Sequence, residues 1–176
     1  MADLTPLLAF RWSPRAFDPD AELTGDEAAS LLEAARWAPS VGNSQPWRFA
    51  LGHRDDETWK RILVSLPAYD QGWARHAAAL VVGAHTGGNQ ERAAYDLGQA
   101  VAHLTVQATA LGLHVHQLAG FDRAALAADL ELPPGVRPLV VAAVGRLGDP
   151  FDLPEELRRR ETALRRRRPV AALLLH

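Results

Sequence analysis

The stretch QERAAYDLGQAVAHLTVQATALG, residues 90–112, carries the strongest helical pattern in the chain. Apolar residues recur along it at steps of three and four, at Leu97, Val101, Leu104, Ala108 and Leu111. This spacing places them on one face of a single helix, and Gly112 is well placed to end it. We therefore expect a long central helix with one buried side, against which the rest of the chain packs.

Shorter segments around this helix predict the other elements. Apolar and β-branched runs predict strands over 47–51, 78–85, 113–118 and 137–145. Short helices are expected over 3–10, 55–65 and 123–130, the last capped by Asp122, and a Thr24–Glu27 capping box predicts a helix that reaches about Trp37. No linker or internal repeat divides the chain. The pattern alone predicts a single α/β or α+β domain over residues 1–176.

The composition excludes several kinds of protein. The 176 residues are 48% hydrophobic and include no cysteine, which excludes disulfides, thiolate chemistry and sulfur-liganded zinc. No signal-peptide pattern stands at the N-terminus, and no apolar run reaches the roughly 18 residues that cross a bilayer. We expect a soluble cytoplasmic protein without a membrane partner.

The distribution of charge is more informative than the net charge of −2. Seven arginines form two runs near the C-terminus, at 158–160 and 165–168. Two interpretations remain open: a solvated charged surface, or an anion site in which guanidinium groups bind phosphate oxygens in pairs. A nucleic-acid interface is disfavoured, because no basic face with interleaved aromatic residues is evident and the net charge is acidic.

A second candidate anion site is RWSPRAF, residues 11–17. Arg11, Ser13 and Arg15 alternate, so in an extended segment they would point to one side and suit a phosphate or an electron-rich ring edge. The alternative is a set of surface arginines beside a helix end.

Other motifs do not indicate conventional catalysis. GAHTGG, residues 83–88, lacks both nucleotide-binding fingerprints and is better interpreted as a turn. His103, His114 and His116 show no sign of converging on a metal, and no serine lies in a nucleophile elbow. An enzyme with this sequence would therefore take its reactivity from a cofactor.

Six segments, in this order, together resemble the FMN-dependent nitroreductase family. They are RWSPRAFD (11–18), APSVGNSQPWRF (38–49), YDLGQAVAHLTVQATALGL (95–113), LAGFD (118–122), LVVAAVGRLGDP (139–150) and RRRRPVAALLLH (165–176). The resemblance implies a three-layer α+β fold with a mixed central sheet flanked by helices. It also implies a homodimer in which a C-terminal strand, here 170–175, crosses to the partner.

The resemblance also implies an FMN site at the dimer interface and no metal. Arg11, Ser13, Arg165 and Arg167 would bind the phosphate, and Arg15 would lie beside the pyrimidine side of the ring. The backbone of Leu118, Ala119 and Gly120 would face the ring, with an amide near N5. Pro39, Ser40 and Asn43 would contact the flavin bound mainly by the other subunit, and Gln45 would tie their loop down.

The implied activity is hydride transfer from NADH or NADPH to flavin N5, and then to a nitroaromatic, a quinone or another small planar acceptor, with ping-pong kinetics and no catalytic side chain. Many members insert a helical excursion between the second strand and the central helix, where this chain has only TGGNQERA, residues 86–93. Trp12, Tyr69 and Trp73 are the candidates to cover the flavin instead. Two alternatives are a flavin-binding protein without turnover and, less favoured, a nucleic-acid binder through the arginine runs.

Overall fold

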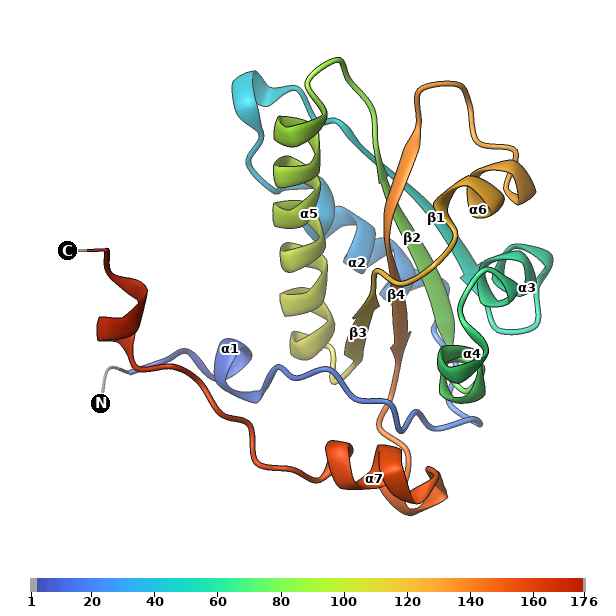
Figure 1. The fold of residues 1–176 in the computed structure, drawn as a ribbon, viewed down its shortest axis with the longest axis vertical. Helices are drawn as coiled ribbons and strands as arrows, with labels where there is room; N and C mark the ends of the chain where they lie inside the picture. Colours follow the sequence, from blue (N-terminus) through green and yellow to red (C-terminus); the bar gives the residue numbers. More distant parts are fainter. Residues whose placement is uncertain (1–2, 176) are drawn as a thin grey trace.

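The computed structural model describes residues 3–175, which build one four-stranded sheet flanked by helices (Figure 1). The strands are β1 (Trp47–His53), β2 (Ala79–His85), β3 (His114–Leu118) and β4 (Arg137–Gly145), in the spatial order β1-β2-β4-β3. All three neighbouring pairs are antiparallel. The four strands predicted from the sequence are therefore confirmed, within a few residues at their ends.

Seven α-helices and three 3₁₀ turns complete the described chain. The helices are α1 (Pro6–Phe10), α2 (Gly25–Arg36), α3 (Glu57–Val64), α4 (Ala68–Ala74), α5 (Gln90–Ala110), α6 (Arg123–Asp129) and α7 (Glu155–Glu161). The 3₁₀ turns are η1 (Val41–Asn43), η2 (Pro150–Asp152) and η3 (Val170–Leu173). In the part of the chain that is described, no helix combines the length and apolarity needed to cross a membrane.

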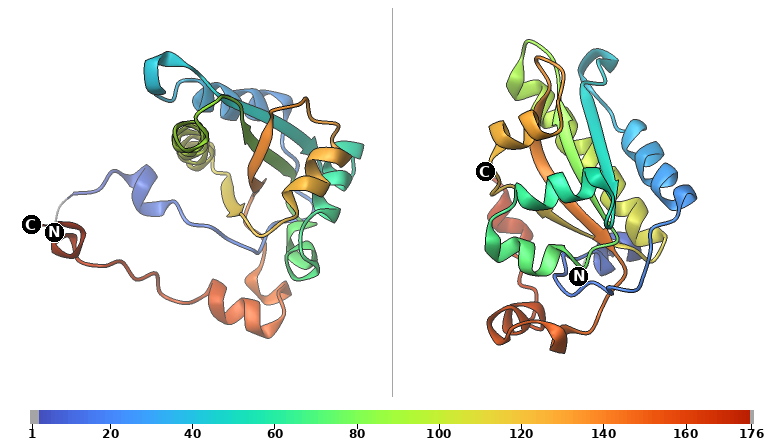
Figure 2. Two further views of the ribbon diagram at one scale, coloured as in Figure 1. Left: turned by 45° about the horizontal axis from the view of Figure 1, so that its top comes forward. Right: turned by 90° about the vertical axis from the view of Figure 1, so that its right-hand side faces the viewer.

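Helices cover both faces of the sheet, which gives three layers (Figure 2). Successive side chains of β2 point to opposite faces of the sheet, so both faces are apolar and need a covering layer. Val81 packs in the core beneath α2 and α5, whereas Leu80 and Val82 pack in the core beneath α3, α4 and α6. All seven residues of β2 are buried, because neither face of this strand meets solvent. The predicted α+β three-layer fold is confirmed.

Local signals set the ends of the two longest helices. The Thr24 hydroxyl accepts a hydrogen bond from the Glu27 N–H, and the Glu27 carboxylate accepts one from the Thr24 N–H at 2.9 Å, so the capping box that starts α2 is present. Gly112 follows α5 with φ of +71°, a left-handed conformation that glycine adopts without steric cost. Both features were predicted from the sequence.

Two expectations about the sheet and tail differ from what one chain shows. The sheet is antiparallel throughout rather than mixed, and the tail forms the short η3 turn rather than a strand. A mixed sheet needs a further strand running parallel to its neighbour, and within residues 3–175 the chain has no such strand. Residue 176, which follows the predicted exchange segment, lies outside the described residues.

The two ends of the chain project together from the body as an arm (Figures 1 and 2). We define the arm as residues 3–10 and 163–175. Its large apolar side chains are exposed, namely Leu4, Leu7, Leu8, Phe10, Leu164, Val170, Leu173, Leu174 and Leu175. Apolar side chains gathered in this way on a protruding segment are typical of an interface.

Candidate functional site

The carboxylate of Glu161, at the end of α7, holds the N-terminal segment in place. Its Oε1 accepts hydrogen bonds from the backbone N–H groups of Arg15 at 2.8 Å and Ala16 at 3.0 Å, and its Oε2 accepts one from Arg15 at 3.0 Å. Glu161 is buried, and hydrogen bonds to a buried ionised group are strong. One side chain near the C-terminus therefore fixes the path of the segment that contains Arg11, Ser13 and Arg15.

Arg165 makes a second connection between the same two segments. Its guanidinium donates to the backbone carbonyls of Ala9, at 2.6 Å, and Arg11. Together with Glu161, it holds residues 9–16 beside residues 161–165, which are about 150 positions apart in the sequence.

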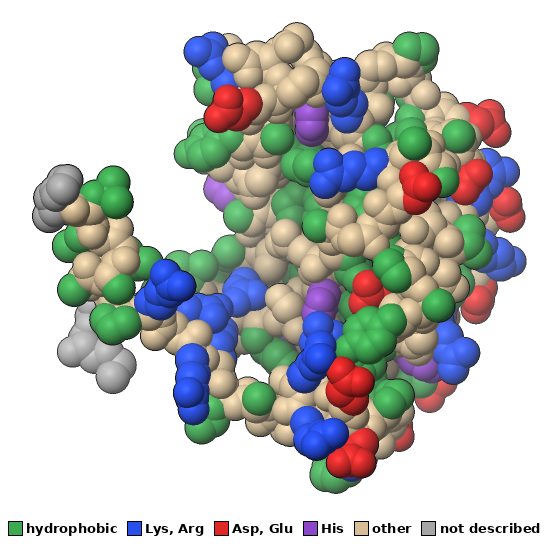
Figure 3. Space-filling model, in the orientation of Figure 1, with side chains coloured by type: hydrophobic (Ala, Val, Ile, Leu, Met, Phe, Trp, Pro, Cys, Tyr) green, Lys and Arg blue, Asp and Glu red, His purple; other side chains and the backbone are tan. Residues whose placement is uncertain are grey.

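This pairing brings three guanidinium groups together, those of Arg11, Arg165 and Arg167. Burial, followed by the charges of Arg165 and Arg167, lowers the pKa of Arg11 from its ordinary value. Within the described residues none of the three forms an ion pair with a carboxylate, and Arg11 donates only to the Ser13 hydroxyl, at 3.4 Å. Figure 3 shows basic side chains gathered where the arm leaves the body. Such a cluster of like charges is stabilised by an anion.

Arg15 lies further along the same segment, against aromatic rings. Its guanidinium carbon stands 5.9 Å from the centroid of Trp73, and its buried Nε has no hydrogen-bond partner among residues 3–175. A ligand with a hydrogen-bond acceptor on its edge would give this Nε–H group the partner that it lacks.

His116 on β3 ties this segment to the sheet. Its Nδ1 lies 2.8 Å from the Pro14 carbonyl and 3.1 Å from the Ser13 carbonyl, and because both are acceptors Nδ1 carries the hydrogen. Burial and then Arg15 lower the pKa of His116. His114 packs edge-on against Trp12, so these histidines position residues 12–14.

The end of β3 leaves backbone exposed at two of the three residues expected to face a flavin. Leu118 is buried in the core, whereas Ala119 and Gly120 are exposed. A Cβ built on Gly120 would meet no atom within 4 Å, so open space adjoins this turn. The geometry fits a flat ligand that approaches the main chain closely.

The loop of residues 38–46 is held in a defined conformation by its own polar groups. Asp96, a buried residue of α5, accepts a hydrogen bond from the Val41 N–H at 3.1 Å, and the Ser40 hydroxyl accepts one from the Gln45 N–H at 3.0 Å. Asn43 adopts φ of +55° and is exposed, as is Pro39. Ser40 and Gln45 therefore act together in fixing the loop, which presents Pro39 and Asn43 outward.

Within one chain this loop is far from the arginine cluster. The loop bonds to Asp96 near the start of α5, whereas residues 11–16 pack on β3, which follows the end of α5 (Figure 1). From Asp96 to Ala110 the helix rises about 20 Å at 1.5 Å per residue. The structure thus brings the first group of predicted residues together and leaves Pro39, Ser40 and Asn43 at the other end of the molecule.

The three aromatic residues expected to cover the flavin differ in accessibility. Trp73 is 1% exposed and packs between Phe17 and His116, so it belongs to the core. Tyr69 is 47% exposed, and Trp12 is half-buried beside a cavity of 180 Å³. Only Tyr69 and Trp12 present surface to a ligand.

The first arginine run does not join the cluster. Arg159 and Arg160 lie on α7 and pair with Glu155 and Glu156 of the same helix, and Arg158 lies over the ring of Phe151. These contacts match the interpretation of a solvated charged surface. The second run alone supplies residues to the site.

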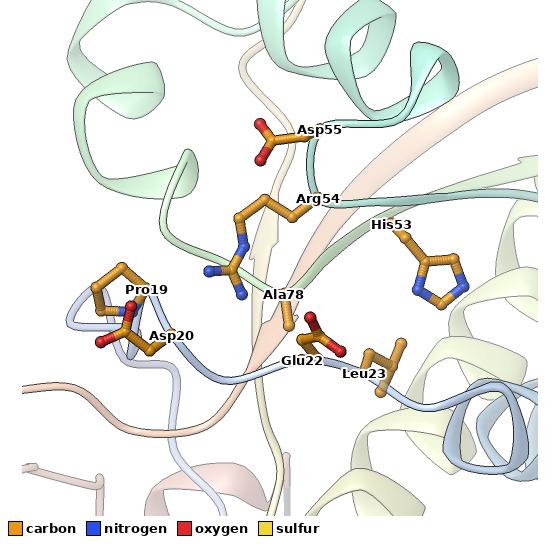
Figure 4. A pocket seen from close by; sticks show the side chains of 8 residues that line it. All are labelled: Pro19, Asp20, Glu22, Leu23, His53, Arg54, Asp55 and Ala78. Atoms are coloured by element: carbon orange, nitrogen blue, oxygen red, sulfur yellow. The ribbon is translucent and has the colours of Figure 1, made fainter.

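A polar cavity of 540 Å³ lies elsewhere, between the segment before α2 and the loop after β1 (Figure 4). Asp20, Glu22 and Asp55 line it, and its Arg54 donates to the Ala21 carbonyl. Three carboxylates around one bonded arginine disfavour a phosphate, so this cavity is a poor candidate for the anion site.

Sequence reasoning missed Glu161 and His116 as positioning residues. Each acts through the backbone of residues more than 100 positions away, at 146 and 102 residues of separation. No local pattern in the sequence signals such a contact, because the burial of Glu161 is visible only in the folded chain.

Comparison with known proteins identifies the family. The Nitroreductase family model matches residues 8–70 and 50–146, and the chain belongs to this family. The chain is 37% identical over 132 residues to the uncharacterized 15.4 kDa protein in the ask 5' region of Mycolicibacterium smegmatis, covering 68% of this chain and 88% of that protein.

Two further similarities add to this assignment. A crystal structure of an oxidoreductase containing FMN superposes with a TM-score of 0.91 at 33% identity, covering 99% of this chain and 91% of that one. A stretch of 54 residues is 35% identical to the oxygen-insensitive NAD(P)H nitroreductase of Salmonella typhimurium, covering 31% of this chain and 25% of that enzyme.

Proposed function

We propose that this protein is an FMN-dependent oxidoreductase that uses NADH or NADPH to reduce nitroaromatic, quinone or related small planar acceptors. The observation that carries the proposal is the convergence of Arg11, Arg165 and Arg167 from both ends of the chain, without a carboxylate counter-ion among residues 3–175. The family and the FMN-containing structural relative support the choice of FMN as the anion.

The residues present fit FMN in their chemistry. The phosphate of FMN carries nearly two negative charges, which the three guanidiniums and the Ser13 hydroxyl would offset with charge-assisted hydrogen bonds. The unpaired Nε of Arg15 would meet a polar edge of the ring, and the open backbone at Ala119 and Gly120 would lie against its face. Bound FMN would supply hydride acceptance and onward reduction, for which no acidic or basic side chain is needed.

The same proposal includes a homodimer with exchanged C-terminal tails. The exposed apolar side chains of the arm support it, because burial against a second copy would remove them from water. The distance between the 38–46 loop and the arginine cluster supports it as well. Pro39 and Asn43 would reach a flavin only if they were presented by a second subunit.

The purified protein provides the direct test. We expect a yellow protein whose visible absorption bleaches when NADH or NADPH is added without oxygen, and recovers when a quinone or nitroaromatic is added. Yellow colour that persists would indicate a flavin-binding protein without turnover. A colourless protein that FMN does not reconstitute would contradict the proposal.

The phosphate assignment has its own test in single arginine variants. Arg11→Ala and Arg167→Ala should each weaken FMN binding about tenfold or more, since a hydrogen bond to a charged group contributes roughly 1.5–3 kcal/mol. Arg159→Ala, in the run that pairs with Glu155 on α7, is the matched control and should bind FMN like the wild type. Wild-type affinity in both Arg11→Ala and Arg167→Ala would overturn the assignment.

A further inference from the structure

A second cavity, of 600 Å³, opens where β2 ends and β4 begins, beside the start of α5 and α6. It is lined by His85, Gln90, Glu91, Ala94, Arg123, Ala124, Ala127, Val136, Arg137 and Pro138. None of these residues belongs to the proposed FMN site. Figure 3 shows basic side chains and a histidine near this upper edge of the molecule.

Two residues that line the cavity, His85 and Gln90, each have a buried polar atom without a hydrogen-bond partner among residues 3–175. His85, the last residue of β2, is 5% exposed, and its buried Nδ1 forms no hydrogen bond within residues 3–175. The Oε1 of Gln90 is also buried without a partner, whereas the amide nitrogen of Gln90 donates to the Gly87 carbonyl at 2.7 Å. The Gly87 carbonyl can only accept a hydrogen bond, so the atom of Gln90 that bonds to it must be the amide nitrogen, and the unpartnered atom is the amide oxygen. Unpaired buried polar groups cost free energy unless a ligand or water satisfies them.

Two arginines give the cavity its positive charge. Arg137 is the strand partner of His85 across β2 and β4, and Arg123 opens α6. Both arginines line the same cavity as His85, and burial, then the charges of Arg137 and Arg123, lower the pKa of His85. Glu91, in the first turn of α5, is the acidic group on the rim. The remaining walls are largely apolar.

From these contacts we propose that the cavity binds a small organic carboxylate that has an apolar body and a hydrogen-bond donor. Arg123 and Arg137 would bind the carboxylate, the alanine, valine and proline side chains would pack on the body, and Gln90 Oε1 would accept from the donor. A monoanion fits better than a phosphate dianion, because Glu91 repels the second charge and the walls are apolar.

The GAHTGG segment places its histidine, His85, in the lining of this cavity. Only Thr86, Gly87, Gly88 and Asn89 separate β2 from α5.

The test is a titration of the full chain, loaded with FMN, with 4-hydroxybenzoate. The probe carries the three required groups, and the readout is the NMR resonance of the His85 ring, assigned by its loss in His85→Gln. We expect a saturable shift and a rise in the His85 pKa, because the carboxylate offsets the arginines. The Arg123→Gln/Arg137→Gln double variant should raise the half-saturating concentration about tenfold or more.

Controls separate this site from the flavin site and from other ligand chemistries. Arg11→Ala removes a guanidinium from the proposed FMN site and should leave the His85 titration unchanged; a matching loss there would overturn the proposal. A His85 resonance that does not move, or that moves equally in the double variant, would also overturn it. Equal binding of 4-hydroxybenzamide would exclude the carboxylate, and equal binding of inorganic phosphate would exclude the apolar body.

Discussion

A single buried carboxylate illustrates how residues far from a ligand set its affinity. Glu161 accepts three hydrogen bonds from two backbone N–H groups, those of Arg15 and Ala16, and forms no hydrogen bond with the arginine side chains of the cluster. We predict that Glu161→Gln weakens FMN binding although every arginine remains. The amide would present an N–H to a backbone donor, and hydrogen bonds to charged acceptors contribute roughly 1.5–3 kcal/mol.

The measurement for Glu161→Gln is the FMN dissociation constant together with the melting temperature. Glu155→Gln, on the exposed face of the same helix, is the control and should change neither. A variant that melts earlier but binds FMN as tightly as the wild type would show that Glu161 acts on stability alone. Such a result would refute its positioning role.

His116 leads to a prediction about pH. Its pKa is lowered in the folded protein, by burial and Arg15 against the opposing effects of the Pro14 and Ser13 carbonyls and Asp70. The unfolded chain therefore takes up the proton first, at about pH 6.5. Stability contributed by neutral His116 is present above that pH and is lost as the pH falls through it.

Melting temperatures measured from about pH 8 to pH 5 would check this, since an ordinary histidine titrates within that window. His116→Gln keeps a donor for the Pro14 carbonyl but cannot titrate, so its melting temperature should fall less on acidification. His103→Gln, at an exposed position of α5, should retain the wild-type slope. Identical slopes for wild type and His116→Gln would contradict the prediction.

At the scale of elements, helices with clear local signals were predictable, whereas two short helices without a capping side chain were not. The capping box of α2 and the apolar stripe of α5 lie within a few residues of the helices they predict. By contrast, α4 and α7 span seven residues each, too few for a periodic stripe, and neither N-cap residue makes a side-chain hydrogen bond. Their stability comes from tertiary packing, of Trp73 and Leu157 in particular, which no local pattern reveals.

The tail is an element whose conformation depends on what covers it. Val170 and the last leucines are exposed in one chain, so they contribute little to the core of that chain. We predict that deleting residues 169–176 leaves the far-ultraviolet circular dichroism close to that of the wild type while the protein dissociates into monomers. Light scattering gives the mass. A truncated protein that remains a dimer would show that the tail is dispensable for assembly.

At the scale of the whole molecule, the family and the pairing of the two arginine-bearing segments were predictable, and the side-chain contacts between them were not. The order of six segments indicated the family, and the arginines from both ends of the chain do converge. The sequence could not reveal that the Arg165 guanidinium donates hydrogen bonds to the backbone carbonyls of Ala9 and Arg11, or that Trp73 is buried. The Arg165 hydrogen bonds and the burial of Trp73 both depend on contacts between segments far apart in the sequence, and no local sequence pattern indicates such contacts.

The separation of the 38–46 loop from the arginine cluster leads to a prediction about the assembled protein. If each site combines the arginines of one subunit with the loop of the other, two defective chains should complement each other. Arg11→Ala disables the first half. Asn43→Gly removes the side chain of the second half while keeping the positive φ that this position requires. We expect each variant alone to bind FMN weakly.

Co-refolding the two variants in equal amounts should restore tight FMN binding at about one quarter of all sites, since half of randomly formed two-fold dimers are mixed and each mixed dimer contains one intact site. The number of tight sites per subunit, from titration with FMN, is the measurement. A site built within one chain would gain nothing from mixing, because every chain would still carry its own defect. Restoration therefore requires that the halves meet across a subunit boundary, and no restoration from two chains that do dimerise would refute the shared site.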